Sequence, residues 1–148
     1  MKVLGIDPGE KRIGLAISDP TGTISRPLSV IRHQSRLTDA QMIVEVVDAQ
    51  GVELIVVGWA LDGEGQVGHA ARKAKRLAEV IRELTLIPVQ MWDESGTTQD
   101  AIQSRIDLGV SKKKRRGHLD ALAASILLQD FLINHEDILT REKNGNDY

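Results

Sequence analysis

The chain begins with two short apolar runs, at residues 3–6 and 13–17, that are separated by Asp7-Pro8-Gly9. Short runs rich in Val and Ile and bounded by Pro and Gly predict two strands joined by a tight connection, so the fold must be built on a sheet. Asp7 stands where the first strand meets the turn. A carboxylate so close to a core costs free energy unless a cation meets it. An Asp before Pro-Gly can equally cap the turn by bonding its own backbone, and this segment alone leaves both interpretations open.

The rest of the chain alternates between strands and helices. Apolar runs and helical periodicity predict strands at 24–30, 54–57 and 87–92 and helices at 38–49, 67–84, 97–108 and 118–133. Thr38 and Gln41 have the spacing of a capping box at the start of the first helix, and Gly51 is expected to end it. The run at 54–57 is continuously apolar, which is typical of a strand covered on both faces.

This order of elements, β-β-β-α-β-α-β-α-α, predicts an α/β fold: a five-stranded mixed sheet with helices on both faces. The first strand is expected at the centre of the sheet, with the strand at 54–57 beside it. A chain of 148 residues is long enough for one domain with a substantial core. We assign residues 1–134 to that domain and expect residues 135–148 to form a polar, loosely ordered tail.

The composition excludes several classes of protein. There are no cysteines, which excludes disulfides, thiolate metal sites and cysteine nucleophiles. No apolar run approaches the roughly 20 residues of a membrane span, and the N-terminal strand lacks the organisation of a secretory signal. We therefore expect a cytoplasmic protein that has no membrane partner.

Three further acidic residues stand out by their position. Asp93 and Glu94 directly follow the strand at 87–92, and Asp120 lies in the first turns of the last helix. Helical spacing puts Asp120 on the same face as Ala124 and Leu127, so its carboxylate should project toward the core. Favourable placement of an acid near a helix N-terminus explains an Asp on the solvent face, but it explains a core-facing Asp poorly.

These acids can meet at one edge of the sheet. Asp7 and Glu94 follow strands that are expected to be parallel neighbours, and ligands of open α/β sheets bind at the carboxyl ends of such strands. Clustered carboxylates protonate unless cations bind, and oxygen-only ligands select Mg²⁺ or Mn²⁺. We therefore predict a Mg²⁺ or Mn²⁺ centre, of the kind that hydrolyses phosphodiesters, at Asp7, Asp93, Glu94 and Asp120. The alternative is that these positions are three unrelated acids with separate structural roles and no shared metal ion.

The positive charges are concentrated, although the net charge is only −2. A run of five cationic residues comes just before the helix that carries Asp120: Lys112, Lys113, Lys114, Arg115 and Arg116. Such a run can be a solvated loop. Beside an acidic centre, however, it is suited to hold phosphates without reading sequence. Lys11 and Arg12, in the first turn, are further candidates for phosphate contacts and can also be simply solvated.

Both tryptophans, Trp59 and Trp92, fall at the ends of central strands. An indole at that edge can stack on an unpaired base of a nucleic acid. It can also close the end of the core, which is the interpretation that we favour for both residues.

Four segments carry a family resemblance through their order and spacing: IDPGEKRIG at 6–14, VVG at 56–58, DE with TT behind it at 93–98, and DALAASILLQDFL at 120–132. Together they resemble the YqgF family of RNase H-fold proteins, which are described as Holliday junction resolvases or pre-16S rRNA nucleases. The resemblance extends from residue 2 to residue 132. It implies an RNase H-like fold and an acidic metal centre that falls here on Asp7, Glu94 (with Asp93) and Asp120.

Two departures from the family pattern affect positions that face the substrate. Ser95-Gly96 stands where the family has Arg and Leu, and Trp59-Ala60 stands where it has Leu and Pro. The metal-binding acids are kept, so these departures bear on substrate preference and on the strength of the activity.

From these observations we expect a metal-dependent nuclease with Asp7, Glu94 and Asp120 as catalytic residues. Its substrate would be structured nucleic acid, through processing of the 5′ end of pre-16S rRNA, Holliday junction resolution, or both. A resolvase cuts two strands symmetrically and would need to be a homodimer. The alternatives are an RNase H-like module that binds nucleic acid with weak or lost catalysis, and an ATP-binding relative of sugar kinases and actin, for which the chain is too short.

Overall fold

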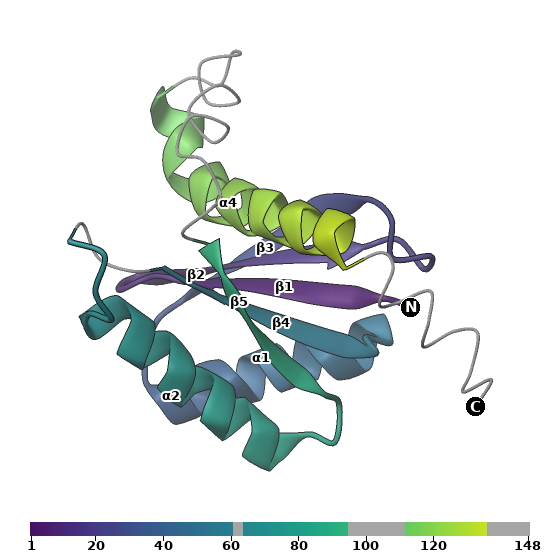
Figure 1. The fold of residues 1–148 in the computed structure, drawn as a ribbon, viewed down its shortest axis with the longest axis horizontal. Helices are drawn as coiled ribbons and strands as arrows, with labels where there is room; N and C mark the ends of the chain where they lie inside the picture. The colour runs from purple at the N-terminus through teal and green to yellow at the C-terminus, as the bar shows by residue number, and fades with distance from the viewer. Residues whose placement is uncertain (61–63, 95–111, 136–148) are drawn as a thin grey trace.

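The computed structural model describes residues 1–60, 64–94 and 112–135, with the backbone alone described at 112–119. The helix predicted at 97–108 and the tail at 136–148 lie outside these ranges. The described elements (Figure 1) are, in chain order, β1 (Val3–Pro8), β2 (Arg12–Ser18), β3 (Ser25–Arg32), α1 (Arg36–Gln50), β4 (Leu54–Trp59), α2 (His69–Leu84), β5 (Val89–Asp93) and α4 (Lys112–Asn134).

The five strands form one mixed sheet in the order β3-β2-β1-β4-β5. β1, β2 and β3 pair antiparallel because short turns connect them, whereas β4 and β5 each follow a helix and pair parallel to their neighbours. The predictions that β1 is central and that β4 lies beside it are confirmed. Because β1, β4 and β5 run in the same direction, their carboxyl ends lie at one edge of the sheet.

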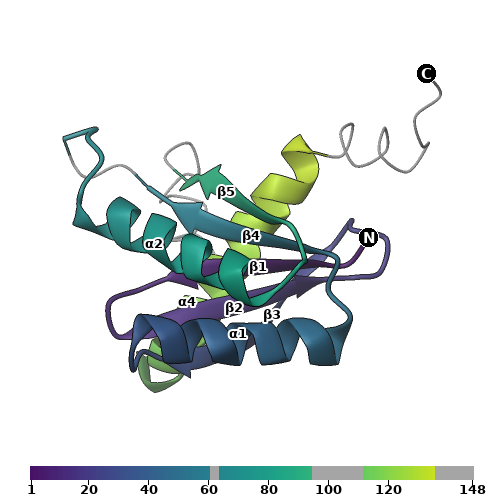
Figure 2. The same ribbon diagram turned by 90° about the horizontal axis from the view of Figure 1, so that it is seen from below.

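Helices cover both faces of the sheet, as predicted. α1 and α2 lie side by side on one face, and α4 crosses the other (Figures 1 and 2). Alternate residues of β1 point to opposite faces, so Leu4 and Ile6 pack toward α1 and α2 while Val3 packs under α4. The result is an apolar core on each side of β1 and β4.

The start of α1 differs from the prediction. The helix begins at Arg36, and Ser35 is its N-cap: the Ser35 hydroxyl accepts a hydrogen bond from the backbone N–H of Thr38 at 3.1 Å. Thr38 therefore lies inside the first turn, because Ser35 fills the capping position three residues earlier. The predicted end is confirmed, since Gly51 adopts the left-handed conformation (φ 67°) and its N–H bonds to the carbonyl of Val47.

α4 begins six residues earlier than predicted, at Lys112. The run at 112–116 thus forms the first turns of this helix, and the interpretation of these residues as a loop is wrong. Lys and Arg are good helix formers, so a cationic run that leads into an apolar helix extends it.

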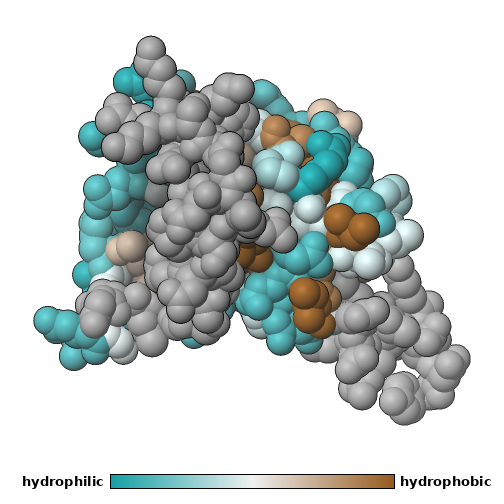
Figure 3. Space-filling model, turned by 90° about the horizontal axis from the view of Figure 1, so that it is seen from above, coloured by the Kyte–Doolittle hydropathy of each residue, from teal (hydrophilic) through white to brown (hydrophobic). Residues whose placement is uncertain are grey.

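On the α4 side, the described residues that are visible are mostly polar (Figure 3). Where described atoms are visible on this side, apolar residues form separate spots between polar ones (Figure 3). A continuous apolar patch is the usual mark of a stable protein interface, and this visible part of the surface does not have one. None of the described helices is long and apolar enough to cross a membrane.

Candidate active site

Asp7 lies near the carboxyl end of β1, on the face that α4 covers. It pairs with Gly14 of β2, and the parallel register of β1 with β4 brings Gly58 level with it on the other side. The turn after β1 is closed by a backbone bond from the N–H of Gly9 to the carbonyl of Arg12, at 2.9 Å. Asp7 is thus flanked by two residues without side chains, and its carboxylate is open to groups that approach from α4 and from the end of β5.

Asp120 reaches this position because α4 lies directly on β2. A Cβ atom at Gly14 would stand only 1.8 Å from the carbonyl oxygen of Asp120, so any side chain at this position would push the helix away. The Asp120 carboxylate is near enough to Asp7 for its charge to raise the Asp7 pKa. On its other side, Oδ2 of Asp120 lies 3.9 Å from Nη1 of Arg12.

Glu94 comes from the opposite direction, directly after the last residue of β5. A Cβ atom at Gly58 would stand 2.1 Å from Oε1 of Glu94 and 2.6 Å from Cδ2 of Leu127. The Glu94 carboxylate therefore occupies the space that the missing side chain leaves. Its Oε1 atom is buried and has no hydrogen-bond partner among the described residues.

The pKa values of all three carboxyls are raised. Burial, followed by the charges of Asp7, Asp93 and Asp130, raises the pKa of Glu94 to about 8. Burial and the charge of Asp120 raise the pKa of Asp7 to about 6. The pKa of Asp120 is also raised by burial, with Arg12 acting in the opposite sense. At neutral pH the three groups cannot all ionise unless positive charge is added between them.

The donor set suits a hard divalent cation. It offers carboxylate oxygens alone, and one of them is a buried acceptor without a partner among the described residues. Among the side chains that the structure describes, no group of three His, Asp or Glu is arranged to hold a metal ion. The carboxylates interact in pairs instead, Asp7 with Asp120 and Asp7 with Glu94. Mg²⁺ commonly takes one or two carboxylates and completes its shell with water and substrate phosphate. The residues present therefore fit an open site for such an ion.

The structure brings together Asp7, Glu94 and Asp120. The other residues predicted for the site lie around these three or outside the described side chains. Asp93, at the end of β5, is exposed and raises the pKa of Glu94. Arg12 lies beside Asp120, and Lys11 is exposed in the turn. For Lys112, Lys113, Lys114, Arg115 and Arg116, the backbone is helical and the side chains lie outside the described residues.

Trp92 closes the end of the core, as we favoured. Its ring packs edge-on against Phe131 at a centroid distance of 5.6 Å, and its Nε1–H donates to Oδ2 of Asp130 at 3.0 Å. Trp59 is partly buried and packs against the core beneath α1 and α2. The two indoles therefore support the ends of β4 and β5 that carry the site.

Sequence reasoning missed Gly14, Gly58 and Asp130. Glycine inside a predicted strand is itself a signal, because it weakens the strand and often marks close approach of another group. Asp130 lies on α4, ten residues after Asp120, and could have been found only through its neighbours in space.

Comparisons with known proteins identify relatives over nearly the whole chain. A family model described as "RuvX: Holliday junction resolvase" matches residues 1–134. A protein of Caldanaerobacter subterraneus subsp. tengcongensis is 41% identical over 133 residues, which cover 89% of this chain and 96% of the relative. One of Syntrophus aciditrophicus is 38% identical over 147 residues, covering 99% and 95%. Both carry the name "Putative pre-16S rRNA nuclease".

Solved structures show the same fold at low sequence identity. Thermus thermophilus RuvC, in complex with a Holliday junction substrate, matches with a TM-score of 0.58 and 17% identity, over 92% of this chain and 96% of that one. The fowlpox virus resolvase, also with Holliday junction DNA, matches with a TM-score of 0.51 and 11% identity, over 89% and 99%. The predicted RNase H-like fold is confirmed.

Proposed function

Because this chain belongs to the RuvX family of Holliday junction resolvases, we propose that it is a nuclease whose catalytic centre is formed by Asp7, Glu94 and Asp120. The observation that carries this assignment is that Glu94 and Asp120 both lie close to Asp7 and that all three carboxyls have raised pKa values. Carboxyls whose pKa values are raised by burial and by neighbouring charge cluster at functional sites.

We propose that Asp7, Glu94 and Asp120 hold Mg²⁺ or Mn²⁺. When bound, such an ion neutralises charge on the phosphate that is cleaved. The chain supplies the rest of the site. Burial keeps water from screening the carboxylates, and Gly14 and Gly58 let them approach Asp7. Arg12, next to Asp120 and only partly buried, is placed to donate to a phosphate oxygen of the substrate.

The substrate that we propose is structured nucleic acid. The names of the relatives point to pre-16S rRNA, and the family model and the solved structures point to Holliday junctions. Lys11, Arg12 and the cationic run at 112–116 would contribute sequence-independent attraction to either backbone. Cleavage of a junction on two symmetric strands would also require a homodimer, which a measurement of mass in solution tests.

Asp7→Asn is the test of the catalytic centre. The variant keeps the size of the side chain and removes its charge, so it should fold normally, bind nucleic acid and lose Mg²⁺- or Mn²⁺-dependent cleavage of precursor rRNA or DNA junctions. Asp48→Asn, at an exposed position of α1, is the matched control and should cleave like the unmodified protein. Full activity of Asp7→Asn would refute the proposed centre.

The open arrangement of the acids also supports a second candidate, a nucleic-acid-binding module with weak catalysis. The two candidates differ in one result. Stabilisation by Mg²⁺ together with tight binding, but without turnover on single-stranded, branched or ribosomal precursor substrates, would favour the binding module.

A further inference from the structure

A second concave site lies on the sheet face opposite the acidic centre. Its volume is about 270 Å³, and the turn after β1, the start of α1 and the side of α2 line it. Pro8, the residue after Asp7, forms part of the wall. Ile13 and Leu77 give it an apolar floor, since both side chains are almost fully buried in the core. The pocket and the acidic centre therefore share the end of β1.

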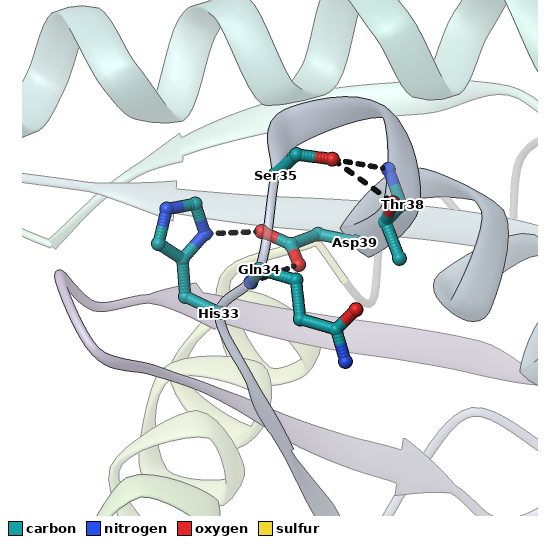
Figure 4. Close-up of polar contacts among 5 residues, drawn as sticks. All are labelled: His33, Gln34, Ser35, Thr38 and Asp39. Carbon is teal, nitrogen blue, oxygen red and sulfur yellow. Dashed lines mark hydrogen bonds and ion pairs between the residues drawn. The ribbon is translucent and has the colours of Figure 1, made fainter.

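A hydrogen bond between His33 and the buried side chain of Asp39 fixes one wall of this pocket. Asp39 is only 1% exposed, and its Oδ2 atom meets Nδ1 of His33 at 2.5 Å while its Oδ1 accepts the backbone N–H of Gln34 at 3.0 Å (Figure 4). A buried carboxylate needs such partners. About a third of the His33 side chain remains exposed, and its Nε2 atom points away from Asp39 (Figure 4). Because Nδ1 is engaged with Asp39, Nε2 is the ring nitrogen left for a ligand.

The remaining charges of the pocket favour an anion. Lys73 of α2 and Arg36 of α1 both line it, and neither forms an ion pair within the part of the chain that the structure describes. Both carboxylate oxygens of Asp39 are already hydrogen-bonded, one to His33 and one to the backbone N–H of Gln34. Glu10, on the exposed turn, is the one acid left to oppose two cations among the lining residues. A ligand with a phosphate and a flat apolar part fits this pocket, because the phosphate can meet Lys73 and Arg36 and the apolar part can lie on the floor.

We propose that this pocket binds one nucleotide of the substrate strand, next to the phosphate held at Asp7; this inference rests on the proposed nuclease function. The pocket is slightly smaller than the range of about 300–1,000 Å³ typical of sites for drug-sized ligands, so it suits a single unit. An unpaired base lies on Ile13 and Leu77, as a base taken out of its stack can lie against apolar side chains in a binding pocket. Its phosphate meets Lys73 and Arg36. The strand crosses the Pro8 turn to connect the two sites.

The experiment uses the full chain with Asp7→Asn, so that strands are bound without being cut. The probes are the four ribonucleoside 5′-monophosphates and short single-stranded RNA and DNA, followed by the NMR signals of the His33 ring. Lys73→Ala should weaken binding of monophosphates and strands about tenfold, the effect of removing one hydrogen bond to a charged group. Lys75→Ala, two residues away on the same helix and not part of the pocket wall, should leave binding within twofold.

The outcomes separate this inference from the proposed function. If monophosphates leave the His33 signals unchanged, or if Lys73→Ala binds like Lys75→Ala, the pocket does not take a nucleotide, whatever the cleavage assay shows. If monophosphates bind but do not compete with the strands, the pocket is a site for a free nucleotide and the assignment to the substrate strand is wrong. If Asp7→Asn loses cleavage while monophosphates and strands still shift the His33 signals, both the proposed catalytic centre and the nucleotide pocket are supported.

Discussion

Gly58→Ala is the substitution that tests most directly how the site is built. The added Cβ would stand 2.1 Å from Oε1 of Glu94 and 2.6 Å from Cδ2 of Leu127. Contacts of a Cβ atom below 3.0 Å essentially never occur, so the Glu94 carboxylate must move by roughly 1 Å or more, a misplacement that typically costs about 100-fold in rate. The shift should appear in activity even though Gly58 touches no substrate.

The same substitution also affects stability, which must be separated from its effect on the site. Overfilling a packed region costs about 1–3 kcal/mol, and for a domain of this size each kcal/mol lowers Tm by about 2–4 °C. Gly51→Ala is the matched control. Its position is left-handed (φ 67°), which strains an alanine by about 1–2 kcal/mol, and nothing lies within 4 Å of the added Cβ.

The assay compares three quantities in the unmodified protein and the two variants: Tm without metal, the rise in Tm with Mg²⁺, and the Mn²⁺-dependent cleavage rate. We expect both variants to melt earlier. Only Gly58→Ala should lose the Mg²⁺-dependent rise and about 100-fold in rate. If Gly58→Ala cleaves within a few fold of Gly51→Ala and keeps its response to Mg²⁺, the space over Gly58 does not position Glu94 and the reasoning is wrong.

Three further predictions concern Gly14, Glu94 and Ser35. Gly14→Ala, whose Cβ would overlap the backbone of Asp120, should destabilise the protein by about 3 kcal/mol, the upper end of the range for overfilling a packed region. A normal transition midpoint in urea unfolding would contradict the packing of α4 on β2. The pKa of Glu94 is raised to about 8 in the folded protein, so the folded protein holds this proton at pH values where the unfolded chain has lost it. The metal-free protein should therefore lose stability as pH rises from the ordinary pKa of a Glu side chain to pH 8. Since Mg²⁺ must displace that proton, its stabilising effect should grow from pH 6 to 8.5 in thermal melts, and an equal effect at both pH values would refute this prediction. Glu94→Gln should abolish both trends above pH 6, while the raised pKa of Asp7, about 6, keeps its own contribution below that pH. Ser35→Ala removes the cap of α1 and should lower stability by about 1 kcal/mol with cleavage unchanged, which chemical unfolding and the nuclease assay check together.

The sequence alone predicted the strands, the place of β1 at the centre of the sheet beside β4, and the meeting of three acids at one edge. Each of those predictions rested on local patterns, such as the apolar run that ends at Asp7 or the position of Glu94 directly after a strand. The helical stripe around Asp120 likewise showed that its carboxylate faces the core. Local patterns were enough because neighbouring parallel strands must share one edge.

Features that depend on contacts between distant segments could not be predicted in this way. The role of Gly14 is defined by Asp120, more than one hundred residues later, and the role of Gly58 by where the Glu94 side chain comes to rest. The pKa values depend on burial, which no spacing rule supplies. His33 and Asp39 are six residues apart across a loop and a helix start, and only the folded chain pairs them.

Two of the three acids proposed to hold the ion come from strands of very different exposure. Asp7 belongs to the central strand, paired on both sides, whereas Glu94 follows β5, which pairs with β4 alone and is partly exposed along its length. Local opening starts where contacts are few. Without an ion, amide hydrogens of β5 should therefore exchange with solvent long before those of β1. Filling the site would join an edge strand of the sheet to its central strand, so that slower exchange at β5 would report occupancy at Asp7.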